Sequence, residues 1–355
     1  MKILLLTKYG RRGATSRIRF FQYIPFLAAH GHQIQIAPFL EDDYIDSLFR
    51  GRRSLRAVAS GFARRIRQMI TARQYDLLWI EKELLPWLPS GLERVRIPYV
   101  VDYDDATFHT YDRNPNPLVR SILGNKIRSV MRGARTVVAG NEYLAEYARK
   151  AGAADVQYVP TVVDLDRYPI HSSKPNDVFT IGWIGSPWTA RYLPAMASVF
   201  HEACRAGQAR MVFIGSGPLA LDGIPFDVRE WREDTEVSEM QSFDAGIMPL
   251  SDEPFERGKC GYKLIQYMAC GKPVVASAVG ANKTIVDEGR TGFLVKTPDE
   301  WIEALNTLRQ DVPRRLAMGQ EARREVEAKY SLQVQAPRVL KILERALAES
   351  QPKSP

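Results

Sequence analysis

Cysteines and long apolar runs are both scarce in this sequence. Its 355 residues include only three cysteines, Cys204, Cys260 and Cys270, and none of them has the spacing of a zinc site. A sparse, odd set of this kind makes a poor disulfide framework and is typical of a protein in a reducing compartment. We therefore expect a cytoplasmic protein whose cysteines are small buried packing residues; a reactive thiol is the alternative.

The scarcity of apolar runs argues against a membrane-spanning protein. No run reaches the roughly 18 residues that a membrane-spanning helix needs. The start, MKILLLTKYG, is apolar over a few residues only, and no small-residue cleavage site follows it. We predict that this start is a buried strand.

Basic residues outnumber acidic ones, and the formal net charge is +8. Such a balance favours an anionic partner, which leaves nucleotides, phosphorylated substrates, anionic lipids and nucleic acids open. The length exceeds what one ordinary hydrophobic core organises, so we expect two domains.

Strand-like and helix-like segments alternate along the first half of the chain. Ser16 is positioned to cap a helix over 17–29, and a long helical stretch covers about 46–73. Alternation of this kind predicts a parallel sheet that is covered by helices on both faces. The strands expected in this half are 2–7, 33–40, 75–81, 97–103, 135–140 and 156–160.

A polar segment with two prolines, PIHSSKPN at 169–176, reads as a linker, and the alternation restarts after it. We predict an α/β protein with two Rossmann-like domains that face each other across a cleft, at 1–168 and 177–335. Residues 336–355 are expected to form a C-terminal helix, with packing back on the N-terminal domain as one option. Ligands of such folds bind at the carboxyl ends of the strands.

One stretch of the second half, GKCGYKLIQYMACGKPVVAS at 258–277, combines a glycine loop, a one-sided helix and a strand. A helix that starts near Gly261 presents unpaired amides and the positive end of its dipole to an anion. Lys259 precedes this start, Lys263 lies in the first turn, and Gln266 follows on the same face. The pattern suits a ligand with two phosphates and a ribose; a surface helix with solvated lysines is the alternative.

This stretch, together with DAGIMPL at 244–250 and GANKTIVDEGRTGFLV at 280–295, resembles the sugar-nucleotide half of retaining glycosyltransferases. The resemblance is to family 4 of the two-Rossmann-domain (GT-B) architecture, and it extends over nearly the whole chain. Residues 13–36 look like the glycine loop and first helix of that family, and 139–168 look like the end of its first domain.

The resemblance implies transfer of a sugar from a nucleoside diphosphate sugar to a hydroxyl acceptor, with retention and without a metal or cofactor. It implies a growing glycan or a lipid-linked glycan as the acceptor, in the synthesis of cell-surface polysaccharide or glycoconjugate. The path that the resemblance implies is attack by the acceptor on the same face that the diphosphate leaves, with the departing diphosphate helping to deprotonate the acceptor.

The sequence departs from the family at two places. Many members carry two glutamates eight positions apart, where this chain has Gly258 and Gln266, and Glu253 or Glu256 is a candidate substitute. The Gly-Arg that many members have after the first strand of this half is absent. The residues that the resemblance places on the nucleotide are Gly185, Ser186, Thr189, Arg191, Lys259, Gly261, Lys263 and Gln266.

A glycine- and arginine-rich loop joins the first strand to the first helix. Through Gly13 and Arg17 it is placed to contact the leaving phosphate or an anionic acceptor. A flexible turn with solvated arginines is the alternative reading.

An acidic segment, DYDDATFH at 102–109, follows the fourth expected strand. Two aspartates two positions apart resemble the metal signature of the other glycosyltransferase architecture, but that fold does not need a second Rossmann half, so we predict no metal. The resemblance makes Asp104, Asp105 and His109 candidates for orienting the acceptor hydroxyl or taking its proton. Helix capping by Asp105 and simple packing of His109 remain open.

A basic segment at 49–74 has eight arginines and no acidic residue, with apolar residues near helical spacing. Such a helix can lie on an anionic membrane surface, and this predicts a peripheral protein on the inner face of the cell membrane. A solvated helix is the bland alternative. No aromatic-interleaved RNA-binding motif or zinc finger is present, so nucleic acid is not an expected partner.

Three other functions stay open on the sequence. A sugar-nucleotide epimerase shares the broad fold and works without an acceptor. A phosphorylase would need a lysine-bound pyridoxal phosphate, for which no clear site is visible. The third alternative is not an enzyme: it is a non-catalytic scaffold that binds membrane or nucleic acid through the basic segment.

Overall fold

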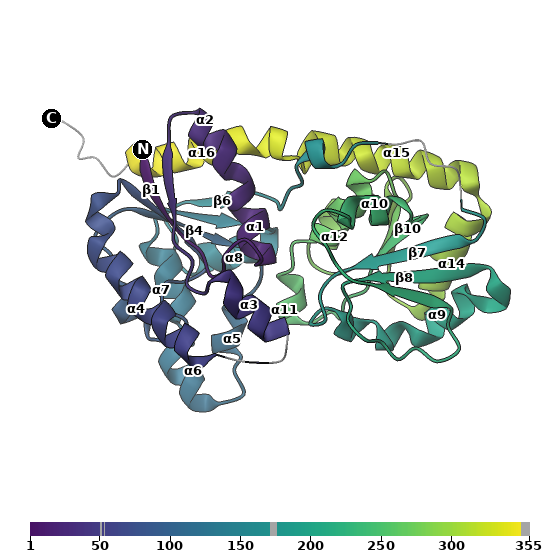
Figure 1. Cartoon of the computed structure of the whole chain (residues 1–355), viewed down its shortest axis with the longest axis horizontal. Helices are drawn as coiled ribbons and strands as arrows, with labels where there is room; N and C mark the ends of the chain where they lie inside the picture. The colour runs from purple at the N-terminus through teal and green to yellow at the C-terminus, as the bar shows by residue number, and fades with distance from the viewer. Residues whose placement is uncertain (50–51, 53, 171–175, 349–355) are drawn as a thin grey trace. The chain divides into compact units, whose positions relative to one another are not determined.

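The computed structural model describes residues 1–49, 52, 54–170 and 176–348. The chain forms two compact units, each built around its own parallel sheet (Figure 1). Unit 1 comprises Met1–Thr161, Gly258–Cys260 and the chain from Gln335 onward, and unit 2 comprises Val162–Arg257 and Gly261–Val334. The prediction of two Rossmann-like domains is confirmed.

The sheet of unit 1 has the order β2-β1-β3-β4-β5-β6. Its central strands are buried apolar runs, as expected for strands covered on both faces. The strands are β1 (Lys2–Leu6), β2 (Gln33–Ile36), β3 (Leu77–Glu81), β4 (Tyr99–Tyr103), β5 (Thr136–Ala139) and β6 (Val156–Tyr158). All six strands expected in the first half are present, and the start of the chain is the predicted buried strand.

The helices of unit 1 follow the strands in the alternating pattern of an α/β fold. They are α1 (Ala14–Arg19), α2 (Ile24–Ala29), α3 (Asp42–Phe49), α4 (Leu55–Thr71), α5 (His109–Asp112), α6 (Pro117–Leu123), α7 (Lys126–Gly133) and α8 (Glu142–Lys150), with short 3-10 turns η1 (Phe21–Tyr23), η2 (Ala72–Gln74) and η3 (Ser90–Glu93). The last helix, α16 (Leu332–Ala348), belongs to unit 1 from Gln335 onward.

The sheet of unit 2 has the order β12-β11-β10-β7-β8-β9, so its first strand lies in the middle. The strands are β7 (Phe179–Ile184), β8 (Ala209–Ile214), β9 (Phe226–Arg229), β10 (Ala245–Met248), β11 (Val274–Ser277) and β12 (Gly292–Val295). The helices are α9 (Ala197–Ala203), α10 (Glu236–Gln241), α11 (Pro254–Arg257), α12 (Tyr262–Ala269), α13 (Asn282–Ile285), α14 (Pro298–Gln310) and α15 (Val312–Lys329), with 3-10 turns η4 (Leu165–Arg167), η5 (Ala190–Tyr192), η6 (Pro194–Met196) and η7 (Arg205–Gly207).

Two expectations about the first helices were wrong. The helix expected over 17–29 is broken into α1, η1 and α2, because Phe20 leaves the helical region and Pro25 restarts the helix in its first turn. Ser16 is not its cap: Gly13 precedes α1, and the Ser16 hydroxyl instead donates to Glu81 at 2.7 Å.

The long helix expected over 46–73 is also two helices, α3 and α4, separated by a segment that includes residues outside the described part of the chain. Most of the linker predicted at 169–176 lies outside the described residues as well.

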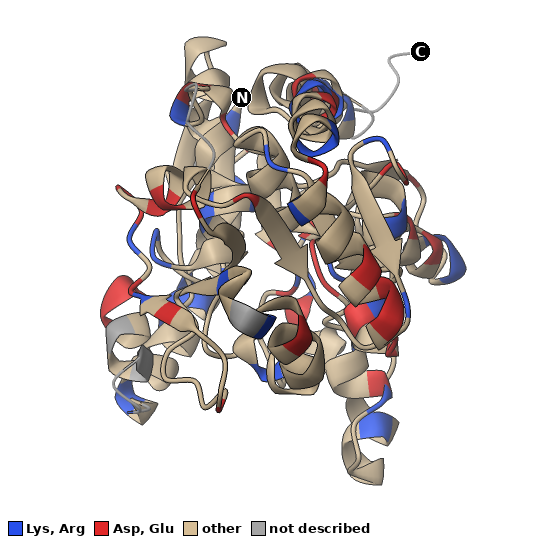
Figure 2. Cartoon of the chain, turned by 90° about the vertical axis from the view of Figure 1, so that its right-hand side faces the viewer, with Lys and Arg blue, Asp and Glu red and all other residues tan. Residues whose placement is uncertain are grey.

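Each unit buries its apolar side chains between its sheet and its helices. In unit 2, Trp183 of β7 and Phe213 of β8 are at most 1% exposed and pack edge to face. All three cysteines are buried and free, which confirms the prediction that they do not form disulfides. Charged residues of both signs are interspersed along the ribbons in Figure 2 rather than separated by sign.

Candidate functional site

The strand order of unit 2 reverses between β7 and β10, where the chain continues outward on either side. In open parallel sheets, ligands bind outside the carboxyl ends of the strands at such a reversal. The loop after β7 begins at Gly185, the loop after β8 contains Gly215, and α12 starts at Gly261 after β10. Glycine therefore lies at each of the three places where backbone can approach a ligand closely.

The start of α12 has glycine in place of a capping side chain. Gly261 has a left-handed φ of 63°, and no side chain caps the helix. A Cβ on Gly261 would lie 2.3 Å from Cδ1 of Ile285, so both its conformation and its surroundings require glycine. The amides of this first turn and the helix dipole together favour a negative ligand.

Lys263, in the first turn of α12, reaches across to the loop after β7. Its Nζ lies 3.4 Å from Oγ1 of Thr189 and 4.8 Å from the centre of the Trp183 ring. A Cβ on Gly185 would lie 2.6 Å from that Nζ, so the absence of a side chain at Gly185 makes room for the lysine. The structure thus brings Lys263, Gly185 and Thr189 together, as the sequence predicted.

The loop after β7 holds a fixed shape beside this lysine. The Ser186 amide donates to Oγ1 of Thr189 at 3.0 Å, and the Thr189 hydroxyl donates back to the Ser186 carbonyl. Gly215 supports the loop from the next strand: its φ is 73°, and a Cβ there would lie 2.4 Å from the Gly185 carbonyl oxygen. Two backbones pack directly here, which a side chain at Gly215 would prevent.

Arg191 is held by an acidic partner in unit 2. Its guanidinium lies 3.0 Å from Oε1 of the buried Glu256 and stacks over Trp188 with 4.4 Å between Cζ and the ring centre. Tyr192 donates to the same carboxylate. A role of Arg191 toward phosphate, predicted from the sequence, would therefore have to compete with Glu256.

Gln266 lies on the buried side of α12, only 4% exposed, and its amide nitrogen donates to the Tyr168 hydroxyl at 3.2 Å. Lys263 in the same helix is half-buried. A contact of Gln266 with a ribose stays a prediction.

The candidate residues Gly258 and Lys259 belong to unit 1 by their contacts. The Lys259 carbonyl accepts a hydrogen bond from Nδ2 of Asn141 at 3.0 Å. A Cβ on Gly258 would lie 2.5 Å from that of Ala106 and 2.6 Å from the Ala106 nitrogen. No longer side chain fits at position 258 in this packing, which gives a physical reason for glycine at this position.

At the carboxyl edge of the unit 1 sheet, Asp104 and Asp105 share one lysine that the sequence analysis missed. Nζ of Lys82 lies 2.9 Å from Asp104 and 2.7 Å from Asp105. Burial alone raises the pKa of Asp105, but the Lys82 charge outweighs it and lowers that pKa to about 2. Asp105 is therefore a carboxylate, and Asp104 pairs with the same lysine. Asp105 does not cap α5, whose N-cap is Phe108.

Lys82 has a left-handed φ of 64°, which is uncommon for a residue with a side chain. The Tyr103 hydroxyl donates to its carbonyl at 2.7 Å and helps to hold this conformation. Strained backbone of this kind is concentrated at functional sites. A lone lysine directly after the buried run LLWIE is the sequence signal that could have found it.

His109 is bonded at both ring nitrogens. Nδ1 lies 2.7 Å from Oδ1 of Asp112, and Nε2 lies 2.8 Å from the Tyr143 hydroxyl. The Asp112 carboxylate orients the ring. The hydrogen bond between His109 and Tyr143 connects α5 to α8. Neither partner had a signal in the sequence, because both contacts depend on the fold.

The loop before α1 also approaches this edge of unit 1. A Cβ on Gly13 would lie 2.4 Å from Cβ of Tyr9, so glycine allows the chain to turn tightly there. Arg17, one turn into α1, is half-buried and donates to the Arg11 carbonyl at 3.5 Å. Their contact with a phosphate stays a prediction.

The basic helix α4 has a buried and an exposed side. Arg65 is 1% exposed and donates to the carbonyls of Thr7 and Ala37, whereas Leu55 and Ile70 are 82% and 75% exposed. Among the described residues, no helix is long and apolar enough to cross a membrane, and no cluster of His, Cys, Asp and Glu could hold a metal ion.

Part of unit 2 is similar in sequence to known glycosyltransferases. Residues 178–311 match the family model described as glycosyl transferases group 1. A D-inositol 3-phosphate glycosyltransferase from Paenarthrobacter aurescens is 38% identical over 94 residues, which are 26% of this chain and 22% of that protein. The aligned segment thus spans less than a quarter of that relative's length.

Two solved structures match nearly the whole chain. A sucrose-phosphate synthase from Thermosynechococcus elongatus superposes with a TM-score of 0.75 and 15% identity, covering 99% of this chain and 100% of that one. HepE of Anabaena, solved in complex with UDP-glucose, superposes with a TM-score of 0.73 and 17% identity, covering 97% and 100%. The chain therefore has the two-Rossmann fold of GT-B glycosyltransferases, and its residues 178–311 are similar to the glycosyl transferases group 1 family.

Proposed function

We propose that the protein is a glycosyltransferase that moves a sugar from a nucleoside diphosphate sugar to a hydroxyl acceptor with retention. The observation that carries the proposal is the convergence of Lys263, Gly185 and Thr189 beside the uncapped start of α12. This convergence lies at the strand reversal of unit 2, where ligands of such sheets bind.

In this proposal, the nucleotide diphosphate binds at the start of α12 and departs from there. The bond from the sugar to the diphosphate breaks, and negative charge grows on the leaving phosphate oxygen. The first-turn amides, the Thr189 hydroxyl and the Lys263 ammonium stabilise that charge from fixed positions, without having to reorganise during the reaction. We propose that this backbone and lysine charge serves in place of a metal ion.

Unit 1 would supply the acceptor side. Lys82 positions the side chains of Asp104 and Asp105, whose oxygens can accept a hydrogen bond from an acceptor hydroxyl. His109 would act through orientation, because Asp112 and Tyr143 occupy its two nitrogens. The proton of the acceptor would pass to the departing phosphate as the new glycosidic bond forms.

We propose a growing glycan or glycolipid at an anionic membrane as the acceptor. The exposed side of α4 combines Leu55 and Ile70 with arginines, the pairing that an anionic bilayer surface attracts. The protein would then act as a peripheral enzyme in the synthesis of cell-surface polysaccharide or glycoconjugate.

A thermal-shift titration with UDP, GDP and dTDP tests the nucleotide site. At about 100 times its dissociation constant, a nucleotide that binds only the folded protein stabilises it by about 2.7 kcal/mol. We expect one of the three to raise the melting temperature and Lys263→Ala to weaken its binding about tenfold or more. Lys341→Ala, at an exposed position of α16, is the matched control and should bind as the parent does.

Turnover separates the proposed transferase from the other functions. The parent is incubated with sugar nucleotides of each base, and release of the nucleoside diphosphate is measured with and without glycan acceptors. Release that Lys263→Ala abolishes supports the proposal. Conversion of the donor sugar to its epimer without diphosphate release would indicate an epimerase, and binding without turnover of any donor would indicate a scaffold.

A further inference from the structure

Unit 1 contains a cavity of about 940 Å³ that has no role in the reaction proposed above. It lies between the η3 turn and α7. Its apolar lining includes Ile80, Leu84, Val95 and Val130. Such a volume falls in the range of small-molecule sites, which are mostly apolar with a few placed polar groups.

Three arginines from two segments line the same cavity. Arg94 and Arg96 are two positions apart on the extended chain after η3, and Arg132 comes from α7. All three are exposed. The Nε of Arg132 donates to the Ala151 carbonyl. The guanidinium has further N–H groups that can donate to a ligand.

The wall that carries Arg94 and Arg96 is anchored by a buried ion cluster. The Lys126 ammonium, with no exposed side-chain surface, lies 2.7 Å from Glu83 and 2.8 Å from Glu93. Oε1 of Glu93 also accepts from the Leu85 amide, while its buried Oε2 has no hydrogen-bond partner among the described residues. The segment between β3 and β4 is therefore fixed in place before any ligand arrives, and Glu93 keeps an acceptor for a ligand hydroxyl.

The cavity lining includes none of the candidate residues at the carboxyl edge of the unit 1 sheet. Tyr99 begins β4, and Gly133 ends the helix that leads into β5, so the lining includes the amino-terminal side of these strands. The candidate residues Asp104, Asp105 and His109 follow the opposite, carboxyl end of β4. The lining also includes Ile80, near the carboxyl end of β3, and Leu84 after that strand, but the reaction proposed above uses neither residue.

The surroundings carry charge of one sign. From 113 to 141 the chain has six lysines and arginines and no acidic residue. An exposed leucine, Leu92, lies between the cavity-lining residues Gly91 and Glu93 and is 58% exposed. Apolar and cationic groups thus occur side by side at this part of unit 1.

We propose that this cavity binds a phospholipid-type anionic amphiphile, with the phosphate at Arg94, Arg96 and Arg132 and the beginning of the hydrocarbon chain on the apolar lining. Arginine pairs with phosphate oxygens through two parallel N–H donors, which suits two guanidinium groups on one wall and a third from α7. A hydroxyl of the headgroup is the matching donor for Glu93. The inference is independent of the proposed transferase reaction.

Binding of short-chain lipid monomers tests the proposal on the full chain. Isothermal titration calorimetry with dihexanoyl phosphatidylglycerol below its micelle concentration should detect binding, and dihexanoyl phosphatidylcholine should bind at least about fivefold more weakly, because its headgroup has no net charge. Glycerol 3-phosphate should also bind more weakly, because it lacks the hydrocarbon. Equal binding of glycerol 3-phosphate would overturn the amphiphile assignment.

Charge-matched variants locate the site. Arg94→Gln/Arg96→Gln should weaken phosphatidylglycerol binding about tenfold or more, since it removes two charged donors. Arg113→Gln/Arg135→Gln removes the same charge at two exposed positions of unit 1 outside the lining and should change binding less than about twofold. Equal losses in both variants would show diffuse attraction and would overturn the site.

A variant that adds a bulky side chain beside the cavity gives a second test of the lipid site, and this test does not depend on charge. A Cβ on Gly91 meets no atom within 4 Å, so Gly91→Phe is tolerated by the backbone and places a ring beside the lining. With an unchanged melting temperature, we expect it to reduce phosphatidylglycerol binding while UDP, GDP or dTDP binding stays as in the parent. Unreduced lipid binding in this folded variant contradicts the proposal.

Discussion

The carboxyl edges of the two sheets differ in the kinds of residue that form them. In unit 2 the edge consists of glycines, helix-start amides and Lys263, whose contacts include the neutral Thr189 hydroxyl. In unit 1 the edge consists of charged side chains that pair with one another, such as Lys82 with Asp104 and Asp105. One edge presents backbone amides and a lysine at the place where we propose that the nucleotide binds, and the other places charged side chains of both signs next to one another within unit 1.

Because of this difference, we expect mutations at the two edges to affect different properties. Loss of a charge in unit 1 leaves a buried partner without compensation, so it should reduce stability first. Loss of Lys263 in unit 2 should reduce ligand binding first. The following predictions test that division, from the largest expected change in the free energy of unfolding to the smallest.

The largest effect is expected at Arg19, which binds Asp102 through two parallel hydrogen bonds of 2.9 and 3.0 Å. The two side chains are 2% and 4% exposed. Arg19→Met leaves a buried carboxylate without its partner and should lower the free energy of unfolding by about 3–5 kcal/mol. Urea denaturation at pH 7 measures the loss.

A second variant shows whether the uncompensated charge is the cause. Arg19→Met/Asp102→Leu removes both charges and should be more stable than Arg19→Met alone. If the double variant is less stable than the single one, the loss of stability comes from side-chain packing in this part of unit 1 and not from the uncompensated charge. The contrast between the two edges would then be weaker than we infer.

The next effect is expected at Gly215, where the glycine edge of unit 2 is tightest. Gly215→Ala combines a left-handed φ of 73° with a Cβ 2.4 Å from the Gly185 carbonyl oxygen, so it should cost about 3 kcal/mol and displace the Gly185 loop. Nucleotide binding should fall with it. Thermal denaturation with and without nucleotide measures both quantities.

Gly289→Ala is the matched control for Gly215→Ala. Gly289 has nearly the same φ, 74°, but a Cβ there meets no atom within 4 Å. We expect this variant to cost about 1 kcal/mol for the backbone alone and to keep nucleotide binding. Equal costs at the two glycines would mean that close packing on the Gly185 loop is not important.

The sequence predicted the glycine edge better than the charged one, for a physical reason. A glycine before an amphipathic helix, as at Gly261, signals a backbone feature that local sequence encodes. The strands were predictable in the same way, because apolar runs bounded by turns are local patterns. Edge strand β9 was not predicted, since its residues Phe226–Arg229 are half-buried or exposed and lack a continuous apolar run.

The charged edge depends on contacts between distant segments, which no local pattern contains. Lys82 meets Asp105 only because β3 and β4 are neighbours in parallel register. Ser16 has the composition of a helix cap, yet its hydroxyl meets Glu81, 65 positions away. Gln266 likewise lies on the predicted helix, but its partner Tyr168 is 98 positions away.

A moderate effect is expected at Lys82, and its pH dependence has a defined sign. The pKa of Asp105 is lowered from 3.8 to about 2 in the folded state, so this group contributes stability above pH 3.8 that is lost as the pH falls through about 2. Lys82→Asn keeps a residue that tolerates a left-handed φ while removing the charge. We expect it to lose about 2 kcal/mol at pH 7.

The same variant should respond differently to acid. Because Lys82→Asn no longer lowers the pKa of Asp105, its stability should fall less than that of the parent between pH 4 and pH 2. Urea denaturation at several pH values in this window measures the difference. Parallel curves for parent and variant would show that the lysine does not control the charge of this carboxylate.

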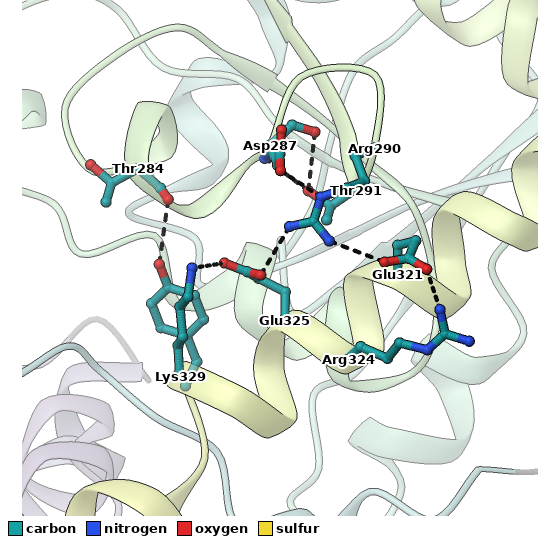
Figure 3. A network of polar contacts seen from close by, with 9 residues as sticks. Thr284, Asp287, Arg290, Thr291, Glu321, Arg324, Glu325 and Lys329 are labelled. Atoms are coloured by element: carbon teal, nitrogen blue, oxygen red, sulfur yellow. Dashed lines mark hydrogen bonds and ion pairs between the residues drawn. The ribbon is translucent and has the colours of Figure 1, made fainter.

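The smallest effect is expected at Arg290, which also has several acidic partners but is exposed. Figure 3 shows its guanidinium between Asp287, Glu321 and Glu325, where it joins a turn to α15, and Lys329 and Arg324 extend the network. Its side chain is 42% exposed, so water screens each pair. Arg290→Gln should cost only about 0.5–1 kcal/mol, and the cost should shrink further in high salt.

Arg324→Gln is the control for Arg290→Gln, because that side chain is 66% exposed and pairs with Glu321 from within α15. We expect its change in unfolding free energy to be smaller still. Arg290 and Arg19 thus test burial against number of acidic partners: three carboxylates around the exposed Arg290 should be worth less than one carboxylate beside the buried Arg19. A loss at Arg290 as large as that at Arg19, and insensitive to salt, would show that the number of partners governs stability and that the edge of unit 1 is not distinguished by its burial.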